Sequence, residues 1–265
     1  PALGLILIVL VGYAMTTGSF GAALSYLFNP DWSKLDGKVL LAALGHAFFT
    51  LSLGMGIMMA YGSYLGQEVN LLRTARTVVI MDTVFALCAG MAIFPIVFAN
   101  GLDPAAGPGL VFVTLPLAFG HMGGGLVIGA LFFLLLTFAA LTSSISLLEP
   151  VVELLEERTP LNRVAATVIA GGTIWALGIA ALLSFNVWSE VKLFNMNIFD
   201  LLDYATSKFM LPLAGLGAIV FAAWKLDQQG VKAELGLGSA GFGLWTLLSR
   251  YVAPVGVLFV FWSNL

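Results

Sequence analysis

The chain has 265 residues, of which 60% are hydrophobic and 9% are charged, with a formal net charge of -3. Soluble domains carry about 25% charged residues, so this composition excludes a soluble protein and indicates an integral membrane protein. No basic patch suggests a nucleic-acid partner. The single cysteine, Cys88, and two distant histidines, His46 and His121, provide neither a disulfide framework nor a metal-site spacing.

Apolar segments follow one another along the whole chain. They cover about residues 2–16 with a glycine-rich continuation to 28, then 39–65, 77–99, 126–155, 164–185, 198–224 and 244–262. A helix crosses the bilayer with roughly 20 residues, so we predict an all-α, multi-pass membrane protein with a single transmembrane domain over residues 1–265. Because the chain begins at Pro1 inside an apolar run, we expect it to be part of a longer protein.

The second segment, residues 39–65, has a weak point at its centre. Thr50, Ser52, Gly54 and Gly56 lie there, and each glycine destabilises a helix by about 1 kcal/mol relative to alanine. Backbone groups released within a membrane are tolerated only where they line a protein-enclosed cavity, and a broken helix offers them to a solute or ion. The alternative is an unbroken helix that packs closely on a neighbour through its small residues.

Basic residues in the connections indicate the orientation. Those on one side are Arg73, Arg76, Arg158, Arg163, Lys225 and Lys232, and those on the other are Lys34, Lys38 and Lys192. The positive-inside rule places the first set in the cytoplasm, so the long connection over residues 100–125 faces outward. This connection contains the apolar run VFVTLPLAF, so we expect it to fold back onto the protein.

Polar side chains within spans are costly and therefore informative. They are His46 and Thr50 in the second segment, Asp82 in the third, Thr142 and Ser143 on one face of the fourth with Ala139, and Asp200 and Asp203 in the sixth. As an alternative, the hydroxyls would only bond to the carbonyl four residues back in their own helix. Asp200 and Asp203 would, as an alternative, be solvated charges at a helix end. Hydroxyl, carbonyl and carboxylate oxygens together suit a hard cation such as sodium. The sequence therefore predicts an ion-coupled transporter or channel, and it shows neither the nucleophile–base pair of an enzyme nor a filter-like loop.

Several motifs resemble the neurotransmitter:sodium symporter family. ALGHAFFTLSLGMG (residues 43–56) is similar to the broken sixth helix of that family, DTVFALCAGMAIFP (82–95) to its seventh, GPGLVFVTLP (107–116) to the outer loop that follows, LTSSISLLEP (141–150) to the eighth, and FDLLDYAT (199–206) to the start of the tenth. The resemblance implies an inverted-repeat bundle of the leucine-transporter type that lacks the first four helices. The end of repeat one would occupy residues 1–30, repeat two 39–225, and an additional helix 240–265.

The resemblance also implies site residues. The substrate pocket would be lined by Phe49, Thr50, Ser52 and Met55 from the sixth helix and by Ser143 and Leu147 from the eighth. One sodium site would use Thr50 and Asp82, and a second would use the Ala139 carbonyl with Thr142 and Ser143. Asp203 would be the outer-gate carboxylate. Each site is incomplete in this chain, because the first helix of the family supplies the remainder.

Asp82 departs from the family pattern. Many relatives have asparagine at this position, and chloride-dependent relatives have a serine one turn later, where this chain has Ala86. Residues 82 and 86 share a helix face, so we expect Asp82 to supply the fixed negative charge that replaces chloride while it also ligates sodium. Chloride would then not be required. His46 replaces the usual glutamine, which changes the region of the chloride site.

The function implied by the resemblance is sodium-coupled symport of an amino acid or related small amine across a bacterial cytoplasmic membrane, with this chain as a partial transporter. Its partners would be the amino acid, sodium and the lipid bilayer. It would be neither an enzyme nor a nucleic-acid binder. A non-transporting membrane fragment and another kind of inverted-repeat solute transporter remain as alternatives.

Overall fold

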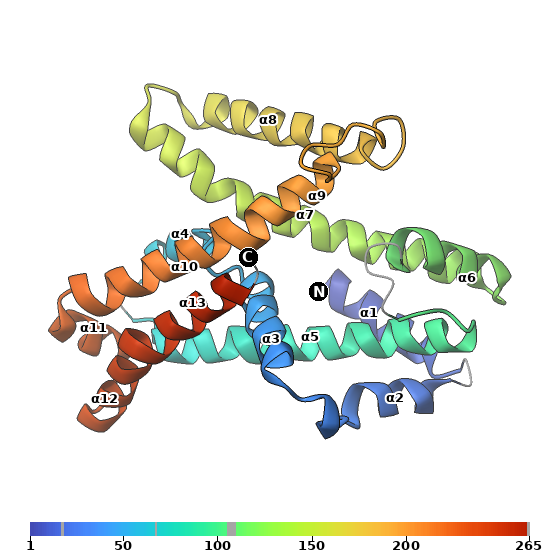
Figure 1. Cartoon of the computed structure of the whole chain (residues 1–265), viewed down its shortest axis with the longest axis horizontal. Helices are drawn as coiled ribbons and strands as arrows, with labels where there is room; N and C mark the ends of the chain where they lie inside the picture. The colour runs from blue at the N-terminus through green and yellow to red at the C-terminus, as the bar shows by residue number, and fades with distance from the viewer. Residues whose placement is uncertain (17–18, 67, 105–109, 264–265) are drawn as a thin grey trace. The chain divides into compact units, whose positions relative to one another are not determined.

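The computed structural model describes residues 1–16, 19–66, 68–104 and 110–263, and every named element among them is helical (Figure 1). The elements are α1 (Ala2–Ala14), α2 (Phe20–Phe28), η1 (Trp32–Lys34), α3 (Gly37–Thr50), α4 (Ile57–Ser63), α5 (Leu71–Ala99), η2 (Leu110–Thr114), α6 (Leu115–His121), α7 (Gly125–Arg158), α8 (Arg163–Leu183), α9 (Ile198–Asp203), η3 (Tyr204–Met210), α10 (Leu211–Val220), η4 (Phe221–Lys225), α11 (Gln228–Leu235), α12 (Ser239–Leu247), η5 (Leu248–Val252) and α13 (Ala253–Ser263). Of the short elements, η1 is a 3-10 turn and η2 to η5 are π-helical.

Within the described residues, five helical stretches are long and apolar enough to cross a membrane: Leu71–Ala99, Gly125–Arg158, Arg163–Leu183, Ile198–Lys225 and Ser239–Phe259. They correspond to the third to seventh predicted segments. The first predicted segment forms α1 and α2, and residues 17 and 18 between them lie outside the described part of the chain. The second predicted segment does not form one long helix; it is divided into α3 and α4.

The chain folds into two compact units, each of which combines two stretches of sequence. One unit contains Pro1–Lys34 and Thr77–Ser144, and the other contains Leu35–Arg76 and Ile145–Leu265. The helices α5 and α7 each contribute to both units. The residues predicted to form the substrate and sodium sites are therefore distributed over the two units.

The unit that begins at Pro1 has an apolar core built by α1, α5, η2, α6 and α7. Its buried members are Leu7, Leu10, Ala92, Ile96, Val97, Leu110, Leu115, Ala118, Phe119, Ile128 and Phe132. Four of these belong to the connection over residues 100–125, and Leu115 is completely buried. The Tyr13 hydroxyl donates to the Gly123 carbonyl at 2.8 Å. The prediction that this connection folds back onto the protein is confirmed.

The other unit is organised around α10, which contacts both α3 and α13 (Figure 1). Phe48 on α3 approaches α10 at Gly215, where an added Cβ would lie 2.6 Å from the Phe48 ring. In the same unit α8 contacts α9, and the ring centroids of Phe185 and Phe199 are 5.0 Å apart. The helix α10 thus supports the end of α3, just before the chain leaves helical conformation.

Candidate functional site

The helix break predicted in the second segment is present. The helix α3 ends at Thr50, and α4 begins only at Ile57. Between them Ser52, Gly54 and Gly56 adopt left-handed backbone conformations, with φ of 54°, 83° and 80°. The prediction is confirmed, and the alternative of an unbroken helix packed through small residues is wrong.

The unwound segment is held by close backbone contacts within its own unit. A Cβ added at Gly54 would lie 2.6 Å from the Leu211 carbonyl oxygen and 2.9 Å from the Gly215 nitrogen, both on α10. At Gly56 the added Cβ would lie 3.4 Å from the Pro150 Cβ on α7. Glycine is therefore required at residue 54 for two reasons: its left-handed φ is costly for other residues, and α10 leaves no room for a side chain.

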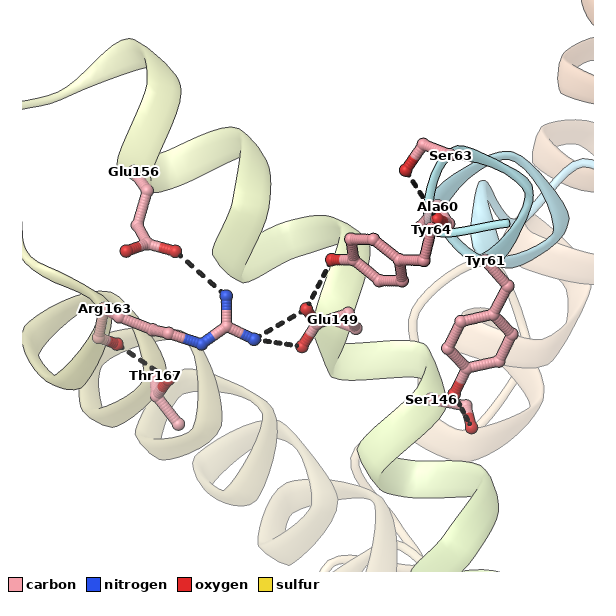
Figure 2. Close-up of polar contacts among 9 residues, drawn as sticks. All are labelled: Ala60, Tyr61, Ser63, Tyr64, Ser146, Glu149, Glu156, Arg163 and Thr167. Atoms are coloured by element: carbon pink, nitrogen blue, oxygen red, sulfur yellow. Dashed lines mark hydrogen bonds and ion pairs between the residues drawn. The ribbon is translucent and has the colours of Figure 1, made fainter. Parts of the chain in front are cut away.

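The residues predicted to bind substrate from this segment lie at the break itself. Phe49 and Thr50 form the exposed last residues of α3, with 56% of Phe49 accessible, and Ser52 and Met55 are half-buried in the unwound segment. The half-helix α4 is bound to α7 next to Leu147, because the Tyr61 hydroxyl donates to Ser146 Oγ at 2.6 Å (Figure 2). These five residues share one compact unit, whereas Ser143 belongs to the other. Their contact with a substrate remains a prediction.

The predicted sodium ligands are divided in the same way. Asp82, Ala139, Thr142 and Ser143 lie in one unit, and Thr50 lies in the other. Thr142 Oγ1 donates to the carbonyls of Phe138 and Ala139, at 3.0 Å each, which is the back-bonded geometry of the structural alternative. This geometry nevertheless brings two predicted ligand oxygens together, and a hydroxyl that donates its proton keeps lone pairs for a cation. No group of His, Cys, Asp or Glu suited to a metal ion occurs among the residues that the structure describes.

Asp203, the predicted gate carboxylate, is the last residue of α9 and is exposed. It accepts a hydrogen bond from Ser207 Oγ at 2.9 Å, one helical turn further on. Asp200 lies in the first turn of α9, where the Asn197 side chain accepts from its backbone N–H at 2.8 Å. His46 is exposed on α3. The gate role of Asp203 remains a prediction.

Sequence reasoning missed a polar network that joins α4, α7 and α8 (Figure 2). Arg163 Nη2 lies 2.6 and 2.7 Å from the two carboxylate oxygens of Glu149, and Nη1 lies 3.2 Å from Glu156 Oε2. The Tyr64 hydroxyl donates to the same Glu149 at 2.8 Å. Glu149 therefore binds both the first residue of α8 and the residue that follows α4. The signal in the sequence was the pair of acids seven residues apart, which lie on one helix face directly before a hairpin turn with arginine.

Comparison with known proteins identifies the family. The model of the sodium:neurotransmitter symporter family matches residues 3–265. The chain belongs to the sodium:neurotransmitter symporter family. The chain is 36% identical to an uncharacterized sodium-dependent transporter of Haemophilus influenzae, over 100% of this chain and 58% of the relative. It is 35% identical to an uncharacterized sodium-dependent transporter of Bacillus subtilis, over 98% of this chain and 59% of the relative.

A solved structure shows the same fold. The crystal structure of MhsT in complex with L-phenylalanine matches with a TM-score of 0.89 and 44% sequence identity, over 100% of this chain and 61% of that chain. The expected inverted-repeat symporter fold is therefore confirmed. The chain spans about three fifths of the length of MhsT and of the two curated relatives.

Substitution of Gly54 tests the close contact at the helix break. Gly54→Ala is expected to destabilise the protein by about 2 kcal/mol or more, because a left-handed alanine is strained and its Cβ meets α10 backbone. Thermal melting in detergent measures the change. Gly62→Ala in α4 is the matched control: nothing lies within 4 Å of the added Cβ, and alanine favours the helix. Equal melting temperatures for Gly54→Ala and the wild type would contradict the described packing.

Removal of Arg163 tests the polar network. Arg163→Met is expected to lower the melting temperature, because it leaves the Glu149 carboxylate, 20% exposed, without its cation; the 55% exposure of Arg163 keeps the loss below that of a fully buried pair. Adding Glu149→Gln should recover part of this loss, since no charge then remains uncompensated. Arg158→Met, at the exposed end of α7, is the control. The network does not stabilise the fold if Arg163→Met and Arg158→Met have equal melting temperatures and the added Glu149→Gln does not raise that of Arg163→Met.

Proposed function

We propose that this chain takes part in sodium-coupled symport of an amino acid or a related small amine across a bacterial cytoplasmic membrane. The observation that carries this proposal is the unwound segment between α3 and α4, in a chain of the sodium:neurotransmitter symporter family. Interrupted helices of this kind offer backbone groups to a solute in the middle of the membrane. Further support comes from the relatives named sodium-dependent transporters and from the structural neighbour, which was solved with L-phenylalanine.

In this proposal the substrate contacts the ends of the broken helix. Phe49 covers it, Thr50 and Ser52 offer hydroxyl and backbone groups, and Met55 contacts its side chain. Methionine is unbranched and flexible, so Met55 would accommodate side chains of differing shape. Ser143 and Leu147 complete the pocket from α7, and Asp203 closes it toward the outside.

Two sodium ions would be transported together with the substrate. Thr50 and Asp82 would contribute to one ion, and the Ala139 carbonyl with the Thr142 and Ser143 hydroxyls would contribute to the other. The 3.0 Å separation of Thr142 Oγ1 and the Ala139 oxygen supports the second set, because both oxygens would then face one cation. Sodium here is a transported ion, and its sites are completed by residues beyond this chain.

Uptake by the full-length protein in proteoliposomes tests the sodium assignment. Thr142→Val and Ser143→Ala are each expected to raise the sodium concentration for half-maximal uptake about tenfold or more, because an interaction with a charged partner is worth about 1.5–3 kcal/mol. Thr137→Val is the matched control, since Thr137 is back-bonded to the Phe133 carbonyl at 2.7 Å on the same helix and is no proposed ligand. An unchanged sodium requirement in both variants would leave these hydroxyls with a structural role alone.

Asp82 provides a test with anions. We expect uptake by the unmodified protein to be equal in chloride and gluconate buffers, because the compensating negative charge is covalently attached at Asp82. Asp82→Asn combined with Ala86→Ser should become chloride-dependent or inactive, since the fixed charge is lost and a chloride-binding hydroxyl is gained. A chloride requirement in the unmodified protein would refute the role of Asp82.

A further inference from the structure

A second polar cluster lies at the inner end of the Ile198–Lys225 span, in the same compact unit as α10. The chain passes there through the π-helical turn η4 before α11 begins. Two side chains bind the carbonyls of this turn: Gln228 Nε2 donates to Ala223 O at 3.2 Å, and Arg250 Nε donates to the same oxygen at 2.8 Å. Arg250 comes from η5, which contacts η4. The guanidinium is thereby held beside the end of α10.

The charge of Arg250 has no carboxylate partner in the part of the chain that the structure describes. Arg250 is not part of the ion pairs that join Lys34 to Asp31 and Arg163 to Glu149 and Glu156. Arg250 is half-buried, and it lies within the apolar span Ser239–Phe259. Basic side chains in such spans almost always pair with an acid or with backbone carbonyls, as Arg250 does through Nε, or reach the membrane surface. The single bond from Nε leaves the other guanidinium N–H groups for an anion from outside the chain.

Residue 250 is near the middle of the apolar stretch Ser239–Phe259. Its contact with Ala223 nevertheless sets it level with the end of the Ile198–Lys225 span, so the two stretches are offset along their length. Ala223 lies two residues before Lys225, where the span ends, and Asp227 then begins the polar helix α11. Trp224 and Tyr251 meet edge to face at this level, with ring centroids 6.5 Å apart, and both are about half exposed. Paired aromatic side chains of this kind are typical of the headgroup region of a membrane.

The surroundings of Arg250 suit a lipid. The apolar side chains of Phe221, Leu247 and Val252 are each more than half exposed, which provides a surface for acyl chains. Lys225 adds an exposed positive charge, whereas the Asp227 carboxylate already accepts from the backbone N–H groups of Gln229 and Gly230. The basic residues of the connections indicate that this end faces the cytoplasm, where anionic lipids favour basic residues near the surface.

We propose that Arg250, Lys225 and the Trp224–Tyr251 pair form a binding site for the phosphate headgroup of an anionic phospholipid in the inner leaflet. The planar guanidinium fork matches phosphate oxygens. The aromatic pair flanks the headgroup, and the exposed apolar residues contact the acyl chains. The bond from Nε to Ala223 holds the fork in position. None of these residues is among those predicted to bind substrate or sodium.

Native mass spectrometry of the full-length protein tests this site. The purified protein is supplied with equal amounts of phosphatidylglycerol and phosphatidylcholine, and retained lipids are counted. The wild type should retain phosphatidylglycerol in preference. Arg250→Gln should weaken phosphatidylglycerol retention about fivefold, because one basic residue near an anionic surface contributes about that factor, and leave phosphatidylcholine unchanged. Arg250→Lys should recover only part of the preference, because the ammonium keeps the charge but lacks the planar fork and the Nε donor. Lys34→Gln, in the connection expected on the opposite side, is the control and should behave as the wild type.

Three results would overturn the proposal: no preference for phosphatidylglycerol in the wild type, an unchanged preference in Arg250→Gln, or displacement of the lipid by millimolar inorganic phosphate. The last result would indicate a site for a soluble anion. If Arg250→Gln fails to fold, Lys225→Gln tests the same site, because Lys225 is exposed and its replacement should not disturb folding. This variant is expected to weaken phosphatidylglycerol retention by a similar factor. An unchanged preference in that variant would then refute the site.

Discussion

The close approach of Gly54 to the backbone of α10 is the contact on which the rest of the broken helix depends. The helix cannot continue through residues 51–56, because Ser52, Gly54 and Gly56 are in left-handed conformations. A left-handed backbone costs glycine little, but at Ser52 it persists only where its surroundings impose it. Here the Leu211 carbonyl and the Gly215 nitrogen occupy the place of a side chain at residue 54. The break is therefore built by tertiary packing as much as by local helix weakness.

The same unit fixes the half-helix beyond the break. The helix α4 and the residue that follows it are bound to α7 by two tyrosine hydroxyls: Tyr61 binds Ser146, and Tyr64 binds Glu149. Glu149 is bound in turn to Arg163 of α8 (Figure 2). Each of these groups has a polar partner, as groups in an apolar environment require. The segment that is predicted to bind substrate thus lies between a backbone contact on α10 and a hydrogen-bonded anchor on α7.

Much of this arrangement could be predicted from the sequence, because its signals are local. The glycines and polar residues at 50–56 predicted the break, and the apolar run after residue 110 predicted a connection that packs on its unit. The network of Tyr64, Glu149 and Arg163 could not be predicted in the same way, since it depends on how three helices meet. The back-bonding of Thr142 was foreseen only as an alternative, and the structure contains this bond.

The π-helical turns have a consequence for how the faces of the long spans are assigned. An α-helix advances by about 100° per residue, and each π turn accommodates roughly one additional residue. The span Ile198–Lys225 contains two such turns, η3 and η4, and Ser239–Phe259 contains η5. A helical wheel drawn with constant steps is therefore rotated out of phase after each of them. Asp203 precedes η3 and Lys225 ends η4, so angular positions taken from residue number alone cannot relate these two charged residues.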